Sequence, residues 1–181
     1  MKYPAILFAV LYMVIRILLF YTGFDDDQYK YLVAINLLFI ILCISVAMYK
    51  NFLSGNEKVE FPDEMKVAMR AVSSYAIVLT AFTFVYYSYI DSGFAQRKLD
   101  VFQYEIEHTD YESMPDTDNP MKVLGISKEE FIKGELEKAG SFLSPFSQAT
   151  LTLMAIMVVG LIYSLIMVVI RMKLLPLLFR K

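Results

Sequence analysis

The chain has 181 residues, of which 57% are hydrophobic and 20% are charged, and its formal net charge is −2. Soluble domains are roughly 45 to 50% apolar, so this composition, with a mean hydropathy of +0.51, excludes an ordinary soluble protein. The near-balance of 17 basic and 19 acidic residues, with no basic block, argues against nucleic-acid binding.

Four long apolar blocks hold the excess of hydrophobic residues. They predict membrane-spanning helices at about residues 5–21, 31–49, 67–90 and 146–170, and none of the 19 acids lies in them. At about 1.5 Å per residue, such helices match a hydrocarbon core of roughly 30 Å. The expected fold is an all-α membrane protein in which residues 1–181 form a single domain of four transmembrane helices.

The distribution of basic residues predicts the orientation of the chain. Nine of them lie before the first span, between the second span and the first turn of the third, or after the fourth: Lys2, Lys50, Lys58, Lys66, Arg70, Arg171, Lys173, Arg180 and Lys181. The first loop instead carries Asp25, Asp26 and Asp27 against Lys30. Because short segments rich in Lys and Arg stay in the cytoplasm, both termini are expected there and residues 91–145 are expected outside.

The long outer loop, residues 91–145, is predicted to hold an amphipathic helical hairpin. Leu99, Phe102 and Ile106 recur at helical spacing in its first half. Turn-forming residues at 113–120 break this helix. Two such helices bury too little apolar area to stand alone, so they must rest on the membrane, the bundle or a partner.

The second helix of the loop has a predicted start and end. Ser127 followed by Glu130 is a capping-box pattern, and Gly140 is the expected end of the helix. Ser144 and Pro145 suit the start of the fourth span. The apolar residues of the two loop helices are the candidate partner-binding residues: Leu99, Phe102, Ile106, Phe131 and Leu136.

Small residues in the fourth span predict close helix packing. Gly160 and Ser164 are four residues apart, and such pairs let helices approach closely in membranes. The sequence leaves open whether the neighbouring helix belongs to the same chain or to a second copy.

Arg16 is a basic residue well inside an apolar block. An arginine inside a span is costly unless it is paired, hydrated or reaches the interface. One interpretation is an anionic-lipid site in which the guanidinium binds a phosphate with Asn36 nearby. The other is a structural arginine that reaches the interface or hydrogen-bonds a carbonyl group or Asn36.

No pattern in the sequence predicts catalysis, a metal or a cofactor. The nucleophile-elbow, zinc-protease and P-loop motifs do not occur. Cys43 is the only cysteine, and His108 is the only histidine. A lone solvated histidine is the better interpretation of His108, because zinc sites need three or four ligands. We therefore expect a protein that is not an enzyme.

The overall pattern resembles a known family. The third span ends in YYSYI, and FLSPFSQATLTLMAIMVVGLIYSLIMVVIRMK places a Ser-Pro-x-x-Gln start, a mid-span glycine and a basic end around the fourth span. These features resemble the bacterial membrane proteins of unknown function DUF4199 over nearly the whole chain. The resemblance implies a bacterial inner membrane and no assigned activity, and it transfers no functional residues.

The expected function is a noncatalytic accessory or scaffold subunit of the bacterial inner membrane. It would act through the outer, periplasmic loop and the bundle surface on another envelope membrane protein or a second copy of itself. The alternative is a protein that binds or translocates an anionic lipid or a polyprenyl phosphate, centred on Arg16.

Overall fold

A computed structural model describes residues 4–23, 29–53, 60–111, 113, 115, 117 and 119–174. Its regular elements within these ranges are all helices. The acidic residues Asp25, Asp26 and Asp27, and the basic residues Arg180 and Lys181, lie outside the described ranges.

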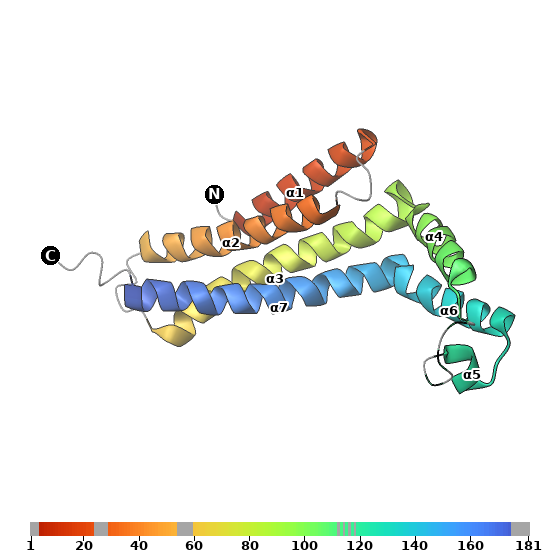
Figure 1. Cartoon of the computed structure of the whole chain (residues 1–181). Coiled ribbons are helices and arrows are strands. Elements are labelled where there is room, and N and C mark those ends of the chain that lie inside the picture. The colour runs from red at the N-terminus through yellow and green to blue at the C-terminus, as the bar shows by residue number, and fades with distance from the viewer. Residues whose placement is uncertain are drawn as a thin grey trace. The chain divides into compact units, whose positions relative to one another are not determined.

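Four helices are long and apolar enough to cross a membrane (Figure 1). They are α1 (Pro4–Tyr21), α2 (Tyr29–Leu53), α3 (Phe61–Val85) and α7 (Pro145–Val169). A π-helical turn follows α3 at Tyr86–Ile90, and another follows α7 at Ile170–Leu174. The prediction of an all-α chain with four membrane-spanning helices is confirmed.

Helix α3 begins ahead of the apolar block that predicted it. The block starts at about residue 67, whereas α3 starts at Phe61 and has Asp63 and Glu64 in its first turn. Proline in the first turn and acidic side chains near a helix N-terminus both favour such a start, and Pro62 supplies the proline. Glu64 is therefore a helical residue, and only 2% of it is exposed.

The chain forms two compact units. The first contains Met1–Phe82 and Thr150–Lys181, and the second contains Thr83–Ala149. In the first unit α1 packs against α2. Its core includes fully buried small residues, among them Ala9, Ala68 and Ala76. Small side chains let helix backbones approach closely, which is how helices associate in a lipid environment.

Gly160 of α7 lies directly against Val72 of α3. A Cβ atom at this position would lie 2.9 Å from Cγ2 and 3.2 Å from Cβ of Val72, and closer still to Cγ1. Ser164, one turn further along α7, is fully buried. At Gly160 the neighbouring helix is thus α3 of the same chain.

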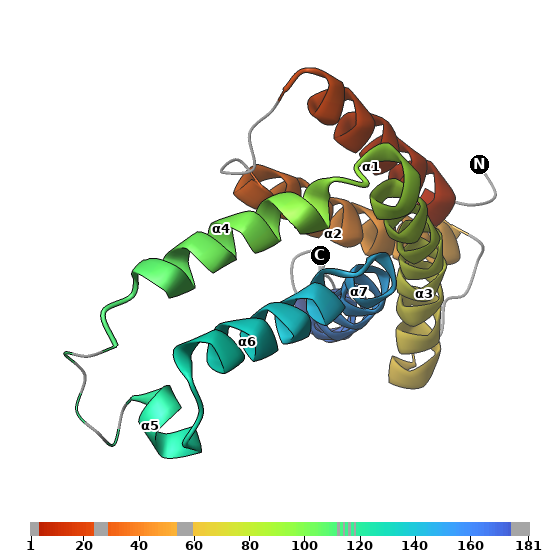
Figure 2. The same ribbon diagram turned by 90° about the vertical axis from the view of Figure 1, so that its right-hand side faces the viewer.

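The second unit contains α4 (Phe94–His108), α5 (Pro120–Leu124) and α6 (Lys128–Leu143). Figure 2 shows α4 and α6 side by side, and the two helices contact each other. The predicted helix end at Gly140 is wrong, because α6 continues to Leu143. Gly140 does not adopt a left-handed φ. A Cβ at Gly140 would lie 3.8 Å from Leu99 Cδ1, so this glycine lies where α4 packs on α6.

Helix caps in the second unit follow the local sequence. The predicted capping box is confirmed, since Ser127 Oγ accepts from the Glu130 amide at 3.2 Å and Glu130 Oε2 accepts from the Ser127 amide at 3.1 Å. Helix α7 begins at Pro145, and Ser144 Oγ accepts from the Ser147 amide at 3.3 Å. The short helix α5 was not predicted, although Asn119 caps its start.

Candidate functional site

A buried ion pair lies at one end of the first unit. Glu64 of α3 and Arg171 after α7 form this pair, and the exposed fractions of their side chains are 3% and 10%. Arg171 Nη1 also donates to the Met48 carbonyl oxygen at 2.9 Å. Asn51 Nδ2 donates to Glu64 Oε1 at 3.0 Å. The cluster therefore joins α2, α3 and the end of α7.

The charges in this cluster compensate each other at close range. Charged groups removed from water need both an opposite charge and further hydrogen bonds, and Glu64 has both. The guanidinium of Arg171 also lies over the Phe52 ring, 5.7 Å from its centroid. Its Nη2 atom is buried and has no hydrogen-bond partner among the described residues. The cluster therefore stabilises the packing of α2, α3 and the end of α7 against one another.

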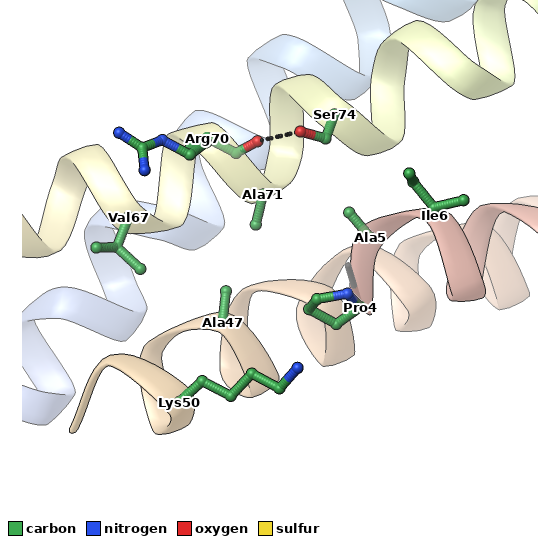
Figure 3. Close-up of a pocket in the computed structure, with 9 residues that line it drawn as sticks. All are labelled: Pro4, Ala5, Ile6, Ala47, Lys50, Val67, Arg70, Ala71 and Ser74. Carbon is green, nitrogen blue, oxygen red and sulfur yellow. Dashed lines mark hydrogen bonds between the residues drawn. The ribbon is translucent and has the colours of Figure 1, made fainter. Parts of the chain in front are cut away.

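A groove opens beside this cluster, between α1, α2 and α3 (Figure 3). Its volume is about 230 Å³. The first turn of α1 contributes Pro4 and Ala5 to the groove, and α2 contributes Lys50. Arg70 and Ser74 line it from α3. Figure 3 shows the Lys50 side chain running toward Pro4, while the Arg70 side chain extends along α3. The groove thus combines apolar walls with two cationic side chains.

The two residues of the predicted lipid site lie on neighbouring helices. Arg16 is half-buried in α1 and Asn36 is half-buried in α2. Asn36 Oδ1 accepts a hydrogen bond of 2.7 Å from the hydroxyl of Tyr75, which is fully buried in α3. Asn36 therefore links α2 to α3, as a polar residue between membrane helices commonly does. The lipid site at Arg16 stays a prediction.

The five candidate partner-binding residues all belong to the second unit, and all are at least partly buried. Ile106 is only 6% exposed, and Leu99, Phe102, Phe131 and Leu136 are half-buried. The Phe131 ring packs against Tyr111, with 5.6 Å between the ring centroids. The apolar stripe that the sequence predicted is therefore turned largely inward, with α6 against α4.

A different stripe of α4 is exposed. Val101 is 57% exposed and Tyr104 is 63% exposed. The Tyr104 ring stacks on His108 at 4.0 Å between centroids. At the other end of the stripe, Arg97 pairs with buried Asp91 at 2.9 Å. Val101 and Tyr104 define an exposed apolar patch on α4.

The next stripe around α4 is polar. Gln96 donates to Asp100 at 2.8 Å, and Gln103 donates to Glu107 at 2.7 Å. These i,i+4 pairs hold the side chains along the helix surface. They provide a natural comparison for the apolar patch beside them.

Sequence reasoning missed the main polar features of the first unit. The sequence analysis used Arg171, Lys50 and Arg70 only as markers of orientation, and it did not single out Glu64. The signal that could have found the ion pair is the Pro62-Asp63-Glu64 helix start, which extends α3 beyond its apolar block. Within the described residues no group of three or more His, Cys, Asp or Glu side chains is arranged to hold a metal ion.

Comparison with known proteins assigns the chain to a family without assigning an activity. No curated protein and no solved structure shows a significant match to the sequence. Residues 4–173 match the family described as a protein of unknown function, DUF4199. That match covers all four long helices and the whole second unit, so the chain belongs to the DUF4199 family.

Proposed function

We propose that this protein is a noncatalytic accessory or scaffold subunit of the bacterial inner membrane. The observation that carries the proposal is the apolar patch of Val101 and Tyr104 on α4, a helix whose other apolar stripe is already used in packing within the unit. The partner is another envelope membrane protein, and residues 91–145 meet it on the periplasmic side.

The patch has the composition of a protein-binding surface. Tyrosine is enriched at such surfaces because it supplies a large, rigid contact area and a polar group at its tip. Arg97 and Asp91 at one end and His108 at the other form a polar rim. An apolar centre with a polar rim is the usual arrangement of an interface.

Site-specific photo-crosslinking in native membranes tests the proposal. A photoreactive amino acid at Val101 or Tyr104 is expected to form one discrete protein adduct, because both side chains would be covered by the partner. The matched control is the same amino acid at Gln103, which is exposed on the polar stripe, and there the adduct is expected to be at least tenfold weaker. Adducts with lipid alone at Val101 and Tyr104, or equal protein adducts at all three positions, would contradict the proposal.

Orientation is a separate part of the proposal, with both termini in the cytoplasm. Single cysteines at Glu129 and Lys66, both exposed, can be introduced after Cys43→Ala. A membrane-impermeant maleimide is added to cells whose outer membrane has been made permeable while the inner membrane stays closed. It is expected to label the cysteine at position 129 and not the cysteine at position 66. The reverse pattern would overturn the positive-inside interpretation.

A further inference from the structure

The corner between α6 and α7 carries large aromatic side chains that are mostly exposed. Helix α6 ends at Leu143 and α7 begins at Pro145, so only Ser144 separates the two helices. Phe142 is 66% exposed on one side of this corner, and Phe146 is 71% exposed on the other. Both residues belong to the second unit. An apolar surface therefore surrounds a short turn at the start of a membrane-spanning helix.

The corner continues an uncharged stretch that is longer than a membrane span requires. Residues 139–170 contain no charged side chain, and Arg171 follows them. About 20 helical residues cross a hydrocarbon core of roughly 30 Å, so a span measured back from Arg171 ends near residue 151. Phe146 lies about 38 Å from Arg171 along the helix, and a bilayer with its headgroups is about 40 to 45 Å thick. The uncharged residues 139–150 therefore fall at the headgroup level.

The end of α3 gives independent evidence that the second unit meets lipid. Residues 71–90 are also free of charge, and Asp91 follows them. Tyr89 lies in the π-helical turn at the end of this stretch and is 79% exposed. Tyrosine favours the headgroup level of a bilayer, because its ring is apolar and its hydroxyl group is polar. Both segments that join the second unit to the long helices thus have the character of a lipid interface.

The hydrogen bonds of the corner suit a place where water is scarce. The last carbonyl groups of a helix have no partner within that helix, and water commonly binds them. Here side chains of α7 bind two of them, since Ser147 Oγ donates to the Ser141 carbonyl oxygen at 2.8 Å and Gln148 Nε2 donates to the Phe142 carbonyl oxygen at 3.0 Å. Backbone groups close to a hydrocarbon core need such partners within the protein. The break between α6 and α7 is therefore compatible with contact to lipid.

We propose that the α6–α7 corner inserts into the interfacial region of the bilayer and anchors the second unit there. The rings of Phe142 and Phe146 lie at the boundary between headgroups and acyl chains, where exposed apolar side chains of a helix bind. The corner is continuous with Leu151 and Met154, which are exposed and apolar in the spanning part of α7. This continuity favours lipid over a protein as the partner, and the inference does not depend on the proposed scaffold role.

Single tryptophans test the depth of the corner, because the chain contains no tryptophan of its own. The full chain carrying Phe142→Trp is reconstituted in phosphatidylcholine vesicles whose acyl chains carry bromine, a fluorescence quencher, either near the headgroups or near the chain ends. Leu161→Trp is the control for the centre of the core, since Leu161 is 44% exposed and lies about 15 Å from Arg171 along the helix. Glu129→Trp is the control for water, since Glu129 is exposed and charged in the first turn of α6.

The three tryptophans are expected to differ in which quencher reaches them. Phe142→Trp is expected to lose most fluorescence with bromine near the headgroups, and Leu161→Trp with bromine near the chain ends. Glu129→Trp is expected to respond to iodide in the water and not to bromine. Quenching of Phe142→Trp by iodide alone would place the corner in water, and quenching by neither would show a protein covering it. Either result overturns the proposal, as does equal bromine quenching of Phe142→Trp and Glu129→Trp.

A second lipid shows whether the corner selects a headgroup. Residues 139–150 carry no charge, so the anchor is expected to respond to the apolar boundary and not to the charge of the lipid. In vesicles of brominated phosphatidylglycerol the quenching of Phe142→Trp is therefore expected to match that in phosphatidylcholine. Quenching that occurs only in phosphatidylglycerol would show a site for anionic lipid and overturn an anchor based on apolar contact.

Discussion

Glu64→Ala is expected to lower the free energy of unfolding by about 3 to 5 kcal/mol, because it leaves Arg171 as a buried charge without its carboxylate. The Nη2 atom of Arg171 already has no hydrogen-bond partner among the described residues. Few groups are therefore in place to offset the loss of the carboxylate. Reversible unfolding in mixed micelles, with sodium dodecyl sulfate as denaturant and circular dichroism as the signal, measures this loss.

Two comparisons show whether the loss comes from the buried charge. Removing both charges, as in Glu64→Gln/Arg171→Met, is expected to recover most of the stability, since an apolar replacement of a buried ion pair is often neutral or stabilising. Glu135→Ala breaks the largely exposed Lys138–Glu135 pair of α6, and a change below about 0.5 kcal/mol is expected there. A similar loss in Glu64→Ala and Glu135→Ala would contradict the structural role of the Arg171–Glu64 pair.

Gly160→Ala is expected to destabilise the first unit by about 1 to 3 kcal/mol, because the added methyl group overlaps Val72. The three heavy atoms nearest to that methyl group all belong to the branched side chain of Val72. A β-branched side chain in a helix has one strongly preferred rotamer, so Val72 can move aside only if α3 and α7 separate. The same unfolding measurement in mixed micelles tests this expectation.

A second change on α3 should relieve the overlap. In Gly160→Ala/Val72→Ala the Cγ atoms are absent, and a favourable coupling of about 0.5 to 3 kcal/mol is expected between the two substitutions. Gly134→Ala in α6 is the control, because a Cβ there would meet no atom within 4 Å. It is expected to stabilise the helix by roughly 0.5 to 1 kcal/mol. Additive effects of the substitutions at positions 160 and 72 would show that α7 and α3 do not meet there.

The long helices were predictable because one local property determines each of them. An apolar block of the right length with almost no charge forms a membrane-spanning helix whatever its neighbours are, and this held for α1, α2, α3 and α7. The capping box of Ser127 and Glu130 was predictable for the same reason, since its hydrogen bonds lie within three residues. The prediction that the helix ends at Gly140 was wrong because the left-handed φ typical of a glycine at a helix end is absent there. Gly140 instead lies where α6 packs against α4.

The site could not be predicted from local patterns. Glu64 and Arg171 are 107 residues apart, and no periodicity in either segment indicates the other. On α4 the spacing of Leu99, Phe102 and Ile106 correctly predicted an apolar stripe. The spacing alone does not indicate whether such a stripe packs within the chain or against a partner. Lys50 and Arg70 line one groove only because α2 and α3 lie together, so the groove is a property of the tertiary structure.

The distance along the chain between Glu64 and Arg171 has a consequence for biosynthesis. The carboxylate emerges from the ribosome 107 residues before its guanidinium partner, an interval of roughly 5 to 20 s at ordinary elongation rates. During this interval Asn51 of α2 can donate a hydrogen bond to Glu64, but the opposite charge of Arg171 is still absent. The end of the bundle that holds Glu64 therefore closes after the last helix has been inserted, and completion of α7 is the event that ends the assembly of the first unit.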